Sequence, residues 1–566
     1  MDAIAEHEPD SSAGARPALT TGTLIAACLA VCVGQVGLAI PAVLNGLFQS
    51  DLHTTSSQLT WISDAFLVPV TLLELTFGVL GDLFGRKRLL IGGAVTLAAG
   101  ELVAALGPAG TTGDARVLVL WGGQIVAGIG AAALFPTTLA MIAAGTHTIS
   151  HRSRSITLWA ASLSAGGFVS PVLGGLITKL HWGNDPTASW RWAFLAVAVL
   201  ALISAATSLV LAVNSSAPAG RSLDWPGQIT IAVSLFALLF AVIQGPTSGW
   251  GSGWVIGGFI IAIIALGLFI AVESRTTSPL LQLGLFTNRA FAMASVATVF
   301  GMFCFLGTAY ATSIRLSAIQ GFTPLKASIA FVLFQGLALV LMPATSRVLE
   351  RFNPKWALGG GAVLMAAGDF WMSSIPARES TDIAPMLAPF AVIGCGFAFA
   401  VSALTAVAVN TVPNRLAGMA SGTTSLLRDF GFTLGPAIVG AVALSRAAAQ
   451  IQHTISGSEP LQRALAAFDK SPETAPPAQR PALQEAVGAV HSGPLGANGV
   501  PGHITLPTGQ SAPFNPLHDV AFHALDSAYS LGYLICGICG LIAAVIAVAG
   551  VGGHADEPMV TEESLA

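Results

Sequence analysis

Long apolar stretches, separated by short polar turns, make up most of this chain. A helix that crosses the hydrocarbon core of a bilayer needs about 20 consecutive, predominantly apolar residues. Windows of that length predict fourteen membrane-spanning helices, at about residues 21–44, 58–80, 88–107, 116–144, 155–179, 190–213, 226–245, 252–273, 290–313, 326–345, 356–375, 384–410, 418–444 and 524–550. The pattern therefore predicts an all-α integral membrane protein.

The composition supports a lipid environment. Hydrophobic residues make up 54% of the 566 positions, whereas charged residues make up 9%. Soluble domains typically carry about 25% charged residues, so this chain cannot cover itself with a water-facing surface. The net charge of −4 gives no sign of a nucleic-acid partner. The six cysteines all fall in apolar stretches, and we expect no disulfide framework, no metal site and no cofactor.

Basic residues distinguish the two faces of the predicted membrane protein. An even number of helices places both termini on one side. The segments on that side hold 13 lysines and arginines, whereas the short segments on the other side hold six. Cytoplasmic loops are enriched in these residues. We therefore expect a multi-pass protein of the cell membrane (inner or plasma), with cytoplasmic tails at residues 1–20 and 551–566.

The chain contains an internal repeat. At a constant offset of 268 residues, GVLGDLFGRKRLLIGGAVTLAAGE, which begins at Gly78, aligns with SRVLERFNPKWALGGGAVLMAAGD, which begins at Ser346. The alignment pairs Glu101 with Asp369, so acids recur in register as well as apolar residues. Chance similarity between Ala- and Gly-rich helices is the alternative, and the matching acids argue against it. Parallel six-helix repeats around a midplane site are a transporter architecture.

The repeat divides the chain into two halves. We expect an N-terminal six-helix bundle at 21–213, two inserted helices at 226–273, and a C-terminal six-helix bundle at 290–550. An external loop at 445–523 precedes the last helix. Its prolines and glycines predict short amphipathic helices and a small hairpin. This loop is either a mobile flap or a plain tether.

A short turn with a glycine and charges joins the second and third predicted helices. In GVLGDLFGRKRLL, Gly85 permits a tight turn, and the acid can pair with a basic neighbour or with the N-terminus of a facing helix. Such a cluster can close one face of a transporter and later release it. A plain basic anchor would not explain the glycine and the acid at fixed spacing. The gating-loop residues are Gly78, Asp82, Gly85, Arg86, Lys87 and, in the second copy, Glu350.

The fifth predicted helix carries small residues and a proline. Small residues let helices approach closely, and a proline frees a backbone carbonyl and bends the helix. A helix of this kind suits two halves that rock against each other, although Gly-rich packing alone is common in membrane helices. The residues of this motif are Gly166, Ser170, Pro171, Gly174 and Gly175.

Several of these segments resemble one known family. The loop GVLGDLFGRKRLL resembles the signature loop of the major facilitator superfamily, and SPVLGG (170–175) resembles the proline–glycine motif of its antiporters. With TWISDAFLVPV (60–70), ASWRWAFL (188–195) and GMASGTTSLLRDFGFTLG (418–435), the chain resembles the 14-helix drug/proton antiporters, including actinobacterial multidrug efflux transporters. The resemblance implies a major facilitator fold, proton-driven efflux of amphipathic or cationic compounds, and a part in antibiotic resistance.

Two positions depart from that family's pattern. In the fourth predicted helix, which carries Gly128 and Gly130, Gln124 stands where the family usually has an arginine. The first helix lacks the acid that many relatives carry, and Cys32 takes about that place. If protons drive transport in this chain, other groups must carry them.

Charged residues inside the predicted helices are candidates for coupling and binding, because each costs about 2.5–3.5 kcal/mol in hydrocarbon. Burial favours the neutral form of a carboxyl group, and a nearby cation favours its charged form. An acid can therefore exchange a proton for a cationic substrate. The candidates are Asp64, Glu74, Glu101, Asp369, Arg428 and Asp429.

These candidates are not equivalent. Asp64 and Asp429 are the main expectations for coupling or cation binding. Arg428 can pair with its neighbour Asp429 or with an acid on another helix, because adjacent helical residues point about 100° apart. The repeat mates Glu101 and Asp369 fit equally well a structural hydrogen bond that recurs in each half.

The leading hypothesis is a secondary active transporter that exports small amphipathic compounds in exchange for protons by alternating access. The alternative is an exporter dedicated to a lipid or a natural product, with atypical or no proton coupling. A receptor or assembly partner that uses residues 445–523 is less favoured, because it would have no use for duplicated gating loops and intramembrane acids. No nucleophile–base pair or phosphate loop points to an enzyme. We expect a monomer in the lipid bilayer.

Overall fold

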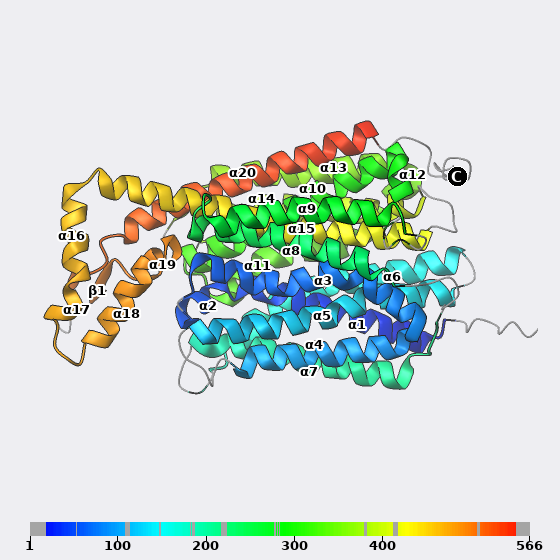
Figure 1. Ribbon diagram of the computed structural model, residues 1–566, viewed down its shortest axis with the longest axis horizontal. Coiled ribbons are helices and arrows are strands. Elements are labelled where there is room, and N and C mark those ends of the chain that lie inside the picture. Colours follow the sequence, from blue (N-terminus) through cyan, green and yellow to red (C-terminus); the bar gives the residue numbers. More distant parts are fainter. Residues whose placement is uncertain are drawn as a thin grey trace, which may run out of the picture.

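The computed structural model places the predicted helices side by side in one bundle, with a smaller extension at one end (Figure 1). It describes residues 19–52, 54–107, 114–146, 149–181, 183, 187–216, 223–276, 279, 281, 283–378, 382–410, 417–505 and 510–550. The predicted tails, apart from Leu19 and Thr20, lie outside the described residues, and so does the side chain of Glu350.

The first half of the chain supplies one half of the bundle. Its elements are α1 (Thr21–Ala39), η1 (Ile40–Val43), α2 (Asn45–Leu52), α3 (Ser56–Phe84), α4 (Arg86–Leu106), α5 (Asp114–Gly145), α6 (Ile149–Ile177), η3 (Thr187–Ser189) and α7 (Trp190–Leu211). The inserted pair follows as α8 (Trp225–Ser248) and α9 (Gly253–Glu273).

The second half begins with a short 3₁₀ turn and contains two π-helical segments. Its elements are η4 (Leu283–Thr287), α10 (Arg289–Ser313), the π-helical η5 (Ile314–Ile319), α11 (Pro324–Phe331), the π-helical η6 (Val332–Gly336), α12 (Leu337–Arg351), α13 (Pro354–Ser374), α14 (Ala384–Asn410), α15 (Ala417–Ser456) and α20 (His518–Gly550). α11, η6 and α12 together correspond to one predicted span.

Thirteen helical segments of the described chain are long and apolar enough to cross a bilayer. The helix α13 is not among them, since it carries three consecutive glycines (359–361), Asp369 and two terminal serines. It nevertheless packs along α14 and α20 inside the bundle, where the sequence predicts the span at 356–375 (Figure 1). The prediction of an all-α membrane protein is confirmed.

The same packing scheme occurs in both halves. α4 packs on α5 and α7, and its counterpart α13 packs on α14 and α20. A β-carbon on Gly130 would lie 2.6 Å from the carbonyl oxygen of Gly93, and one on Gly396 would lie 2.5 Å from that of Gly361. Gly93 and Gly361 are partners in the sequence repeat at the offset of 268, and Gly130 and Gly396 correspond at an offset of 266, so the two copies use the same glycines for the same close helix contacts.

Of the inserted pair, α8 lies against α3 and α15, one helix from each half, and α9 packs on α8. Val68, Val242 and Ala437 belong to a small hydrophobic cluster at this junction. Gln228 of α8 also hydrogen-bonds the side chain of Thr76 and the carbonyl of Leu72 on α3. The insertion therefore covers the seam between the halves.

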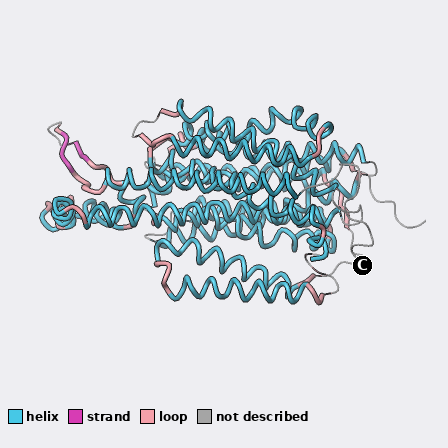
Figure 2. The backbone as a smooth tube through the Cα atoms, turned by 90° about the horizontal axis from the view of Figure 1, so that it is seen from above, coloured by secondary structure: helices cyan, strands magenta, loops and turns pink. Residues whose placement is uncertain are grey.

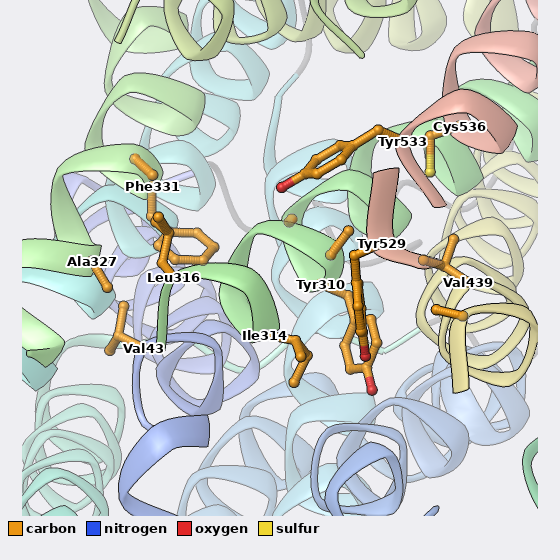
Figure 3. Packing of buried hydrophobic residues seen from close by; sticks show 14 of the residues in the cluster. Val43, Tyr310, Ile314, Leu316, Ala327, Phe331, Val439, Tyr529, Tyr533 and Cys536 are labelled. Carbon is orange, nitrogen blue, oxygen red and sulfur yellow. The ribbon is translucent and has the colours of Figure 1, made fainter. Parts of the chain in front are cut away.

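A large hydrophobic core fills the second half and extends to the first. Figure 3 shows Tyr310 of α10 and Tyr529 of α20 with their rings side by side and their hydroxyl groups pointing the same way. Tyr533 lies one turn further along α20, and its hydroxyl is 2.9 Å from that of Thr312. All three rings are buried.

Residues 457–517 form the extension, and the bundle end that bears it is called the loop end here. The opposite end, where α1 begins and α20 ends, is called the terminal end (Figure 1). The extension contains α16 (Glu459–Asp469), α17 (Ser471–Thr474), α18 (Arg480–His491), α19 (Pro494–Gly499) and an antiparallel hairpin of β1 (His503–Thr505) and β2 (Ser511–Pro513). It projects beyond the bundle (Figure 2).

The extension has the short helices and the hairpin that its prolines and glycines predict. Its bounds differ from the predicted loop at 445–523, because α15 continues to Ser456 and α20 begins at His518. Residues at both edges of the predicted loop are therefore helical.

Candidate functional site

A cavity lies between the two halves of the bundle. Its empty volume, including the part open to solvent, is about 1080 Å³. α1, α3, α5 and α6 line it from the first half, and α10, α11, η6, α14 and α15 line it from the second. Its aromatic lining residues are Phe135, Phe305, Tyr310, Phe331, Phe397 and Phe432.

A charged cluster bridges the halves beside this cavity. Arg428 of α15 donates to both carboxylate oxygens of Asp429, with Nε at 2.7 Å from Oδ1 and Nη2 at 3.0 Å from Oδ2. The same Nη2 lies 3.9 Å from Oε1 of Glu74 on α3. Both acids are buried, and Arg428 and Asp429 line the cavity. Two carboxyl groups from different halves thus share one guanidinium group.

Two threonines hold the helices that carry the cluster. Thr71 Oγ1 of α3 lies 2.9 Å from Thr433 Oγ1 and 3.2 Å from the backbone carbonyl oxygen of Asp429 on α15. Thr71 is about one turn before Glu74, and Thr433 is one turn after Asp429. These contacts place the acid of α3 opposite the arginine of α15.

Asp64 lies apart from this cluster. It is fully buried in α3, and neither of its carboxylate oxygens has a hydrogen bond in the described part of the chain. One turn earlier, Thr60 is bonded to the Tyr310 hydroxyl at 2.8 Å, across the seam between the halves. Asp64 interacts electrostatically with Tyr310 but is not one of the residues that line the cavity.

The repeat mates Glu101 and Asp369 lie inside their own halves. Thr308 of α10 donates to Asp369 Oδ1 at 2.7 Å, and Cys304 Sγ donates to Oδ2 at 3.2 Å. Glu101 has Gln124 of α5 beside it, and its Oε1 would be 3.2 Å from a β-carbon on Gly37 of α1. Both acids are therefore enclosed by helices of one half, away from the cavity.

The gating loop is an ordered turn at the terminal end. Gly85 has φ +99°, a conformation that favours glycine. Asp82 accepts from Arg86, with Nη2 at 2.6 Å from Oδ1. The turn is tied to the segment after α7, because Asn214 Oδ1 accepts from the backbone N–H of Lys87 at 3.2 Å. These contacts all stay within the first half.

The second copy of the loop uses a different backbone conformation. Asn353, the repeat mate of Gly85, has φ −58° and accepts from the N–H of Lys355 at 3.1 Å as the N-cap of α13. The two copies therefore do not share the positive φ of Gly85. An asparagine cap replaces the glycine turn, since its side chain satisfies a free N–H at the start of the helix.

The motif of α6 packs on both halves. Ser170 is buried and donates to the carbonyl oxygen of Val36 on α1 at 2.9 Å. A β-carbon on Gly175 would lie 2.6 Å from the Cα of Leu325 on α11. Pro171 and Gly167 line the cavity. α6 is therefore in close contact with its own half on one side and with the other half on the opposite side.

The helices of the two halves meet at the loop end. Asn45 of α2 donates to the Ser313 hydroxyl of α10 at 2.7 Å, and Ser313 donates in turn to the Ala42 carbonyl. Gly46 packs directly against Ser317 of η5. The extension adds α19, whose Asn498 donates to the carbonyl oxygen of Ala318 at 3.1 Å. These contacts join the two halves on the loop-end side of the cavity.

Several residues of the site were missed from the sequence. Gln35 and Gln335 line the cavity. The candidates predicted inside the helices were charged residues, so these two neutral amides were not among them. Arg315 lies outside the cavity and just beyond the predicted span at 290–313, so it was expected in a loop. It is instead buried in η5 and donates to the carbonyl oxygens of Met372 and Ile375. The two glutamines could have been found in the sequence as polar residues within apolar windows.

The fold and the cavity define a membrane transporter with two helical halves around a central site. Residues 25–436 match the family model described as Major Facilitator Superfamily. The chain belongs to this superfamily, as the sequence motifs predicted. The superfamily consists of transporters, which agrees with the expectation that the chain is not an enzyme.

Curated relatives cover most of the chain. The Tetracenomycin C resistance and export protein of Streptomyces glaucescens is 27% identical over 445 residues, which is 78% of each chain. The Multidrug resistance protein Stp of Mycobacterium tuberculosis is 28% identical over 76% of each chain. The Multidrug efflux pump LfrA of Mycolicibacterium smegmatis is 25% identical and covers 70% of this chain and 75% of its own.

Solved structures share the fold. A bacterial homologue of the human drug peptide transporters PepT1 and PepT2 superposes with a TM-score of 0.56 at 17% identity, over 94% of this chain and 97% of its own. The xylose transporter XylE from E. coli superposes with a TM-score of 0.51 at 14% identity, over 74% of this chain and 89% of its own. At these identities the likeness concerns the fold alone.

Proposed function

We propose that this protein exports small amphipathic compounds from the cytoplasm in exchange for protons. The observation that carries the proposal is the buried cluster of Glu74, Arg428 and Asp429 at the wall of the cavity. The names of the curated relatives, which refer to drug resistance and export, support the direction of transport.

The charge balance of this cluster suggests how a proton couples to a substrate. With both carboxyl groups ionised and the arginine protonated, the cluster carries one net negative charge. A net charge is costly in a medium of low dielectric constant, so the cluster favours one additional positive charge. A proton supplies it in one state, and in another the positive part of a substrate, or the positive end of a hydroxyl dipole in an uncharged one, offsets the charge. Binding of one then promotes release of the other.

The position of the cluster links this exchange to the movement of the halves. Glu74 belongs to α3 of the first half, whereas Arg428 and Asp429 belong to α15 of the second. Protonation of Glu74 weakens its attraction to Arg428 across the seam. Asp64 is proposed as a second proton site, since it is buried on the same helix and lies near the Tyr310 hydroxyl of the other half.

We further propose that the terminal end faces the cytoplasm and that the protein acts as a monomer in the cell membrane. The basic residues of the loops at that end support this orientation. The contacts of α2 with η5 would then close the cavity on the outer side, and substrate would enter from the cytoplasm. The gating loop at Asp82 and Arg86 would lie at the entrance.

Transport in inside-out membrane vesicles tests this proposal. Uptake of ethidium is measured with an imposed pH gradient and after the gradient is collapsed, for the wild type, Glu74→Gln, Asp429→Asn and Asp64→Asn. Asp114→Asn, at the exposed start of α5, serves as the matched acid-to-amide control. We expect gradient-dependent uptake in the wild type and the control, with at least about tenfold less in Asp429→Asn.

The possible failures are distinct. Uptake by the wild type that does not respond to the gradient would exclude proton coupling. Full gradient-driven uptake in Glu74→Gln, Asp429→Asn and Asp64→Asn would exclude these acids as the coupling groups. An absence of flux for a compound that binds the purified protein would favour a receptor over a transporter.

A further inference from the structure

The cavity wall has few charges for a ligand. Of the described residues that line it, only Arg428 and Asp429 are charged. They lie side by side with two hydrogen bonds between them. A ligand therefore meets a neutralised pair rather than an isolated charge, and most of its polar contacts must come from uncharged side chains.

Two glutamines supply such contacts from opposite halves. Gln35 of α1 and Gln335 of η6 both line the cavity, and both are partly exposed to it. In the part of the chain that the structure describes, neither amide has a hydrogen-bond partner. An amide offers both N–H donors and a carbonyl acceptor, so each can bind a neutral polar group of a ligand.

Two adjacent glycines of α6, Gly166 and Gly167, make room for these glutamines. The amide of Gln335 lies directly on Gly167, and a β-carbon there would overlap it. A β-carbon on Gly166 would lie 2.8 Å from the β-carbon of Gln35. Adjacent positions of the same helix thus give space to one glutamine from each half.

Gln335 lies in a π-helical turn that has no counterpart in the described residues of the first half. Residues 332–336 form η6, whereas the corresponding residues 64–68 lie in the regular α-helix α3. Leu67, the repeat mate of Gln335, also lines the cavity but offers only an apolar surface. π-helical turns are frequent at functional sites, and here one brings a polar group into an otherwise apolar wall.

A cluster of aromatic side chains forms one surface of the same cavity. The rings of Phe305 and Phe397 are stacked, with their centroids 3.6 Å apart and their planes 12° from parallel. Phe432 lies next to them, with its ring centroid 6.3 Å from that of Phe305. Such a surface favours offset stacking with a planar ring system.

We propose that Gln35 and Gln335 select the substrate, and that the preferred substrates are planar aromatic compounds without a permanent charge that carry carbonyl and hydroxyl groups. This inference rests on the proposed role of the cavity as the transport site. A site that hydrogen-bonds such groups discriminates against analogues that lack them, because its own polar groups then stay unpaired. Permanently cationic compounds without carbonyl groups gain less from this wall.

Binding to the purified full-length protein tests the inference with two probes. The neutral probe is 1,8-dihydroxyanthraquinone, and the cationic probe without carbonyl groups is ethidium. Their dissociation constants are measured by fluorescence at pH 7.5 for the wild type, Gln335→Ala, Gln335→Glu and Gln244→Ala. Gln244 is a partly buried glutamine of α8 outside the cavity, so Gln244→Ala is the matched control.

We expect tighter binding of the anthraquinone than of ethidium in the wild type and in the control. Loss of one neutral hydrogen-bonding group in Gln335→Ala should weaken anthraquinone binding roughly 3- to 10-fold and leave ethidium binding unchanged. Gln335→Glu should reverse the preference, because it removes an N–H donor and adds a carboxyl group. A gain in ethidium binding cannot result from misfolding.

Three results would overturn the inference. The first is a wild type that binds neither probe or prefers ethidium, and the second is an equal loss of affinity for both probes in Gln335→Ala. The third is a ratio of the two dissociation constants in Gln335→Glu that equals that of the wild type. Efflux of the same probes is measured separately. If the ratio changes as expected but the wild type shows no flux, the ligand class stands and the transport function fails. If flux is present but the ratio does not respond, the transport function stands and the inference fails.

Discussion

The charged cluster makes a quantitative prediction about stability as well as transport. In Arg428→Gln the two carboxyl groups of Glu74 and Asp429 remain, and their shared cation is lost. Removing one partner of a buried ion pair typically costs 3–5 kcal/mol. Because 13% of the Arg428 side chain is exposed, we expect the lower limit of this range, about 3 kcal/mol.

Removing both partners should cost less than removing the arginine alone. In Arg428→Gln/Asp429→Asn the bidentate pair is replaced by two neutral amides, and a single acid remains at Glu74. That acid can take up a proton, so no unpaired charge is left in the cavity wall. We expect the double variant to regain at least about 1 kcal/mol of the loss, as contacting residues in one network do not act additively.

Thermal unfolding of the detergent-purified protein, at one fixed scan rate, measures these differences as shifts of the midpoint. Glu74→Gln leaves the Arg428–Asp429 pair intact and serves as the control, with a midpoint close to that of the wild type. A midpoint of Arg428→Gln equal to that of the wild type would refute the reasoning. A double variant whose loss of stability exceeds the sum of the losses in the two single variants would also refute it.

Three further predictions follow from the packing. Gly130→Ala should destabilise the protein by about 1–3 kcal/mol through overpacking, and Gly122→Ala, which has open space around it, should not; thermal unfolding compares them. Gly85→Ala should cost about 1–2 kcal/mol because of its positive φ, and a normal midpoint would contradict the observed turn. A disulfide between Gly46→Cys and Ser317→Cys, whose β-carbons would lie 3.2 Å apart, should abolish transport until reductant is added. The pair Gly502→Cys and His518→Cys has the same spacing within one half and should leave transport unchanged; equal activity of both oxidised pairs would argue against opening at the loop end.

The sequence located the helices closely. The predicted span at 384–410 coincides with α14, and the span at 253–273 differs by one residue from the prediction. Apolar length is a local property, because each helix must satisfy its own backbone hydrogen bonds in lipid. The prediction was less accurate where helices leave the membrane, as in the twelve residues by which α15 continues beyond the predicted end at 444.

The repeat was also readable from the sequence, and it extends to individual contacts. Gly93 and Gly361 are partners in the repeat, and each packs against a glycine of the following helix, Gly130 or Gly396. Small residues recur in both copies because two backbones approach closely at each site. The offset did not predict local conformation, since Asn353 caps a helix where Gly85 forms a turn with positive φ.

The amino-acid sequence by itself determined the lipid environment of this protein, the positions of its helices and its internal repeat. These features depend only on the length of the apolar stretches and on the order of the residues. Only the tertiary structure decided which buried groups meet. Glu74 contacts Arg428, 354 positions away, while Asp64 on the same helix lies apart from the cavity. Gln335 reaches Gly167 through a π-helical turn. The rotation of each helix depends on all of its neighbours at once, and no local pattern contains that information.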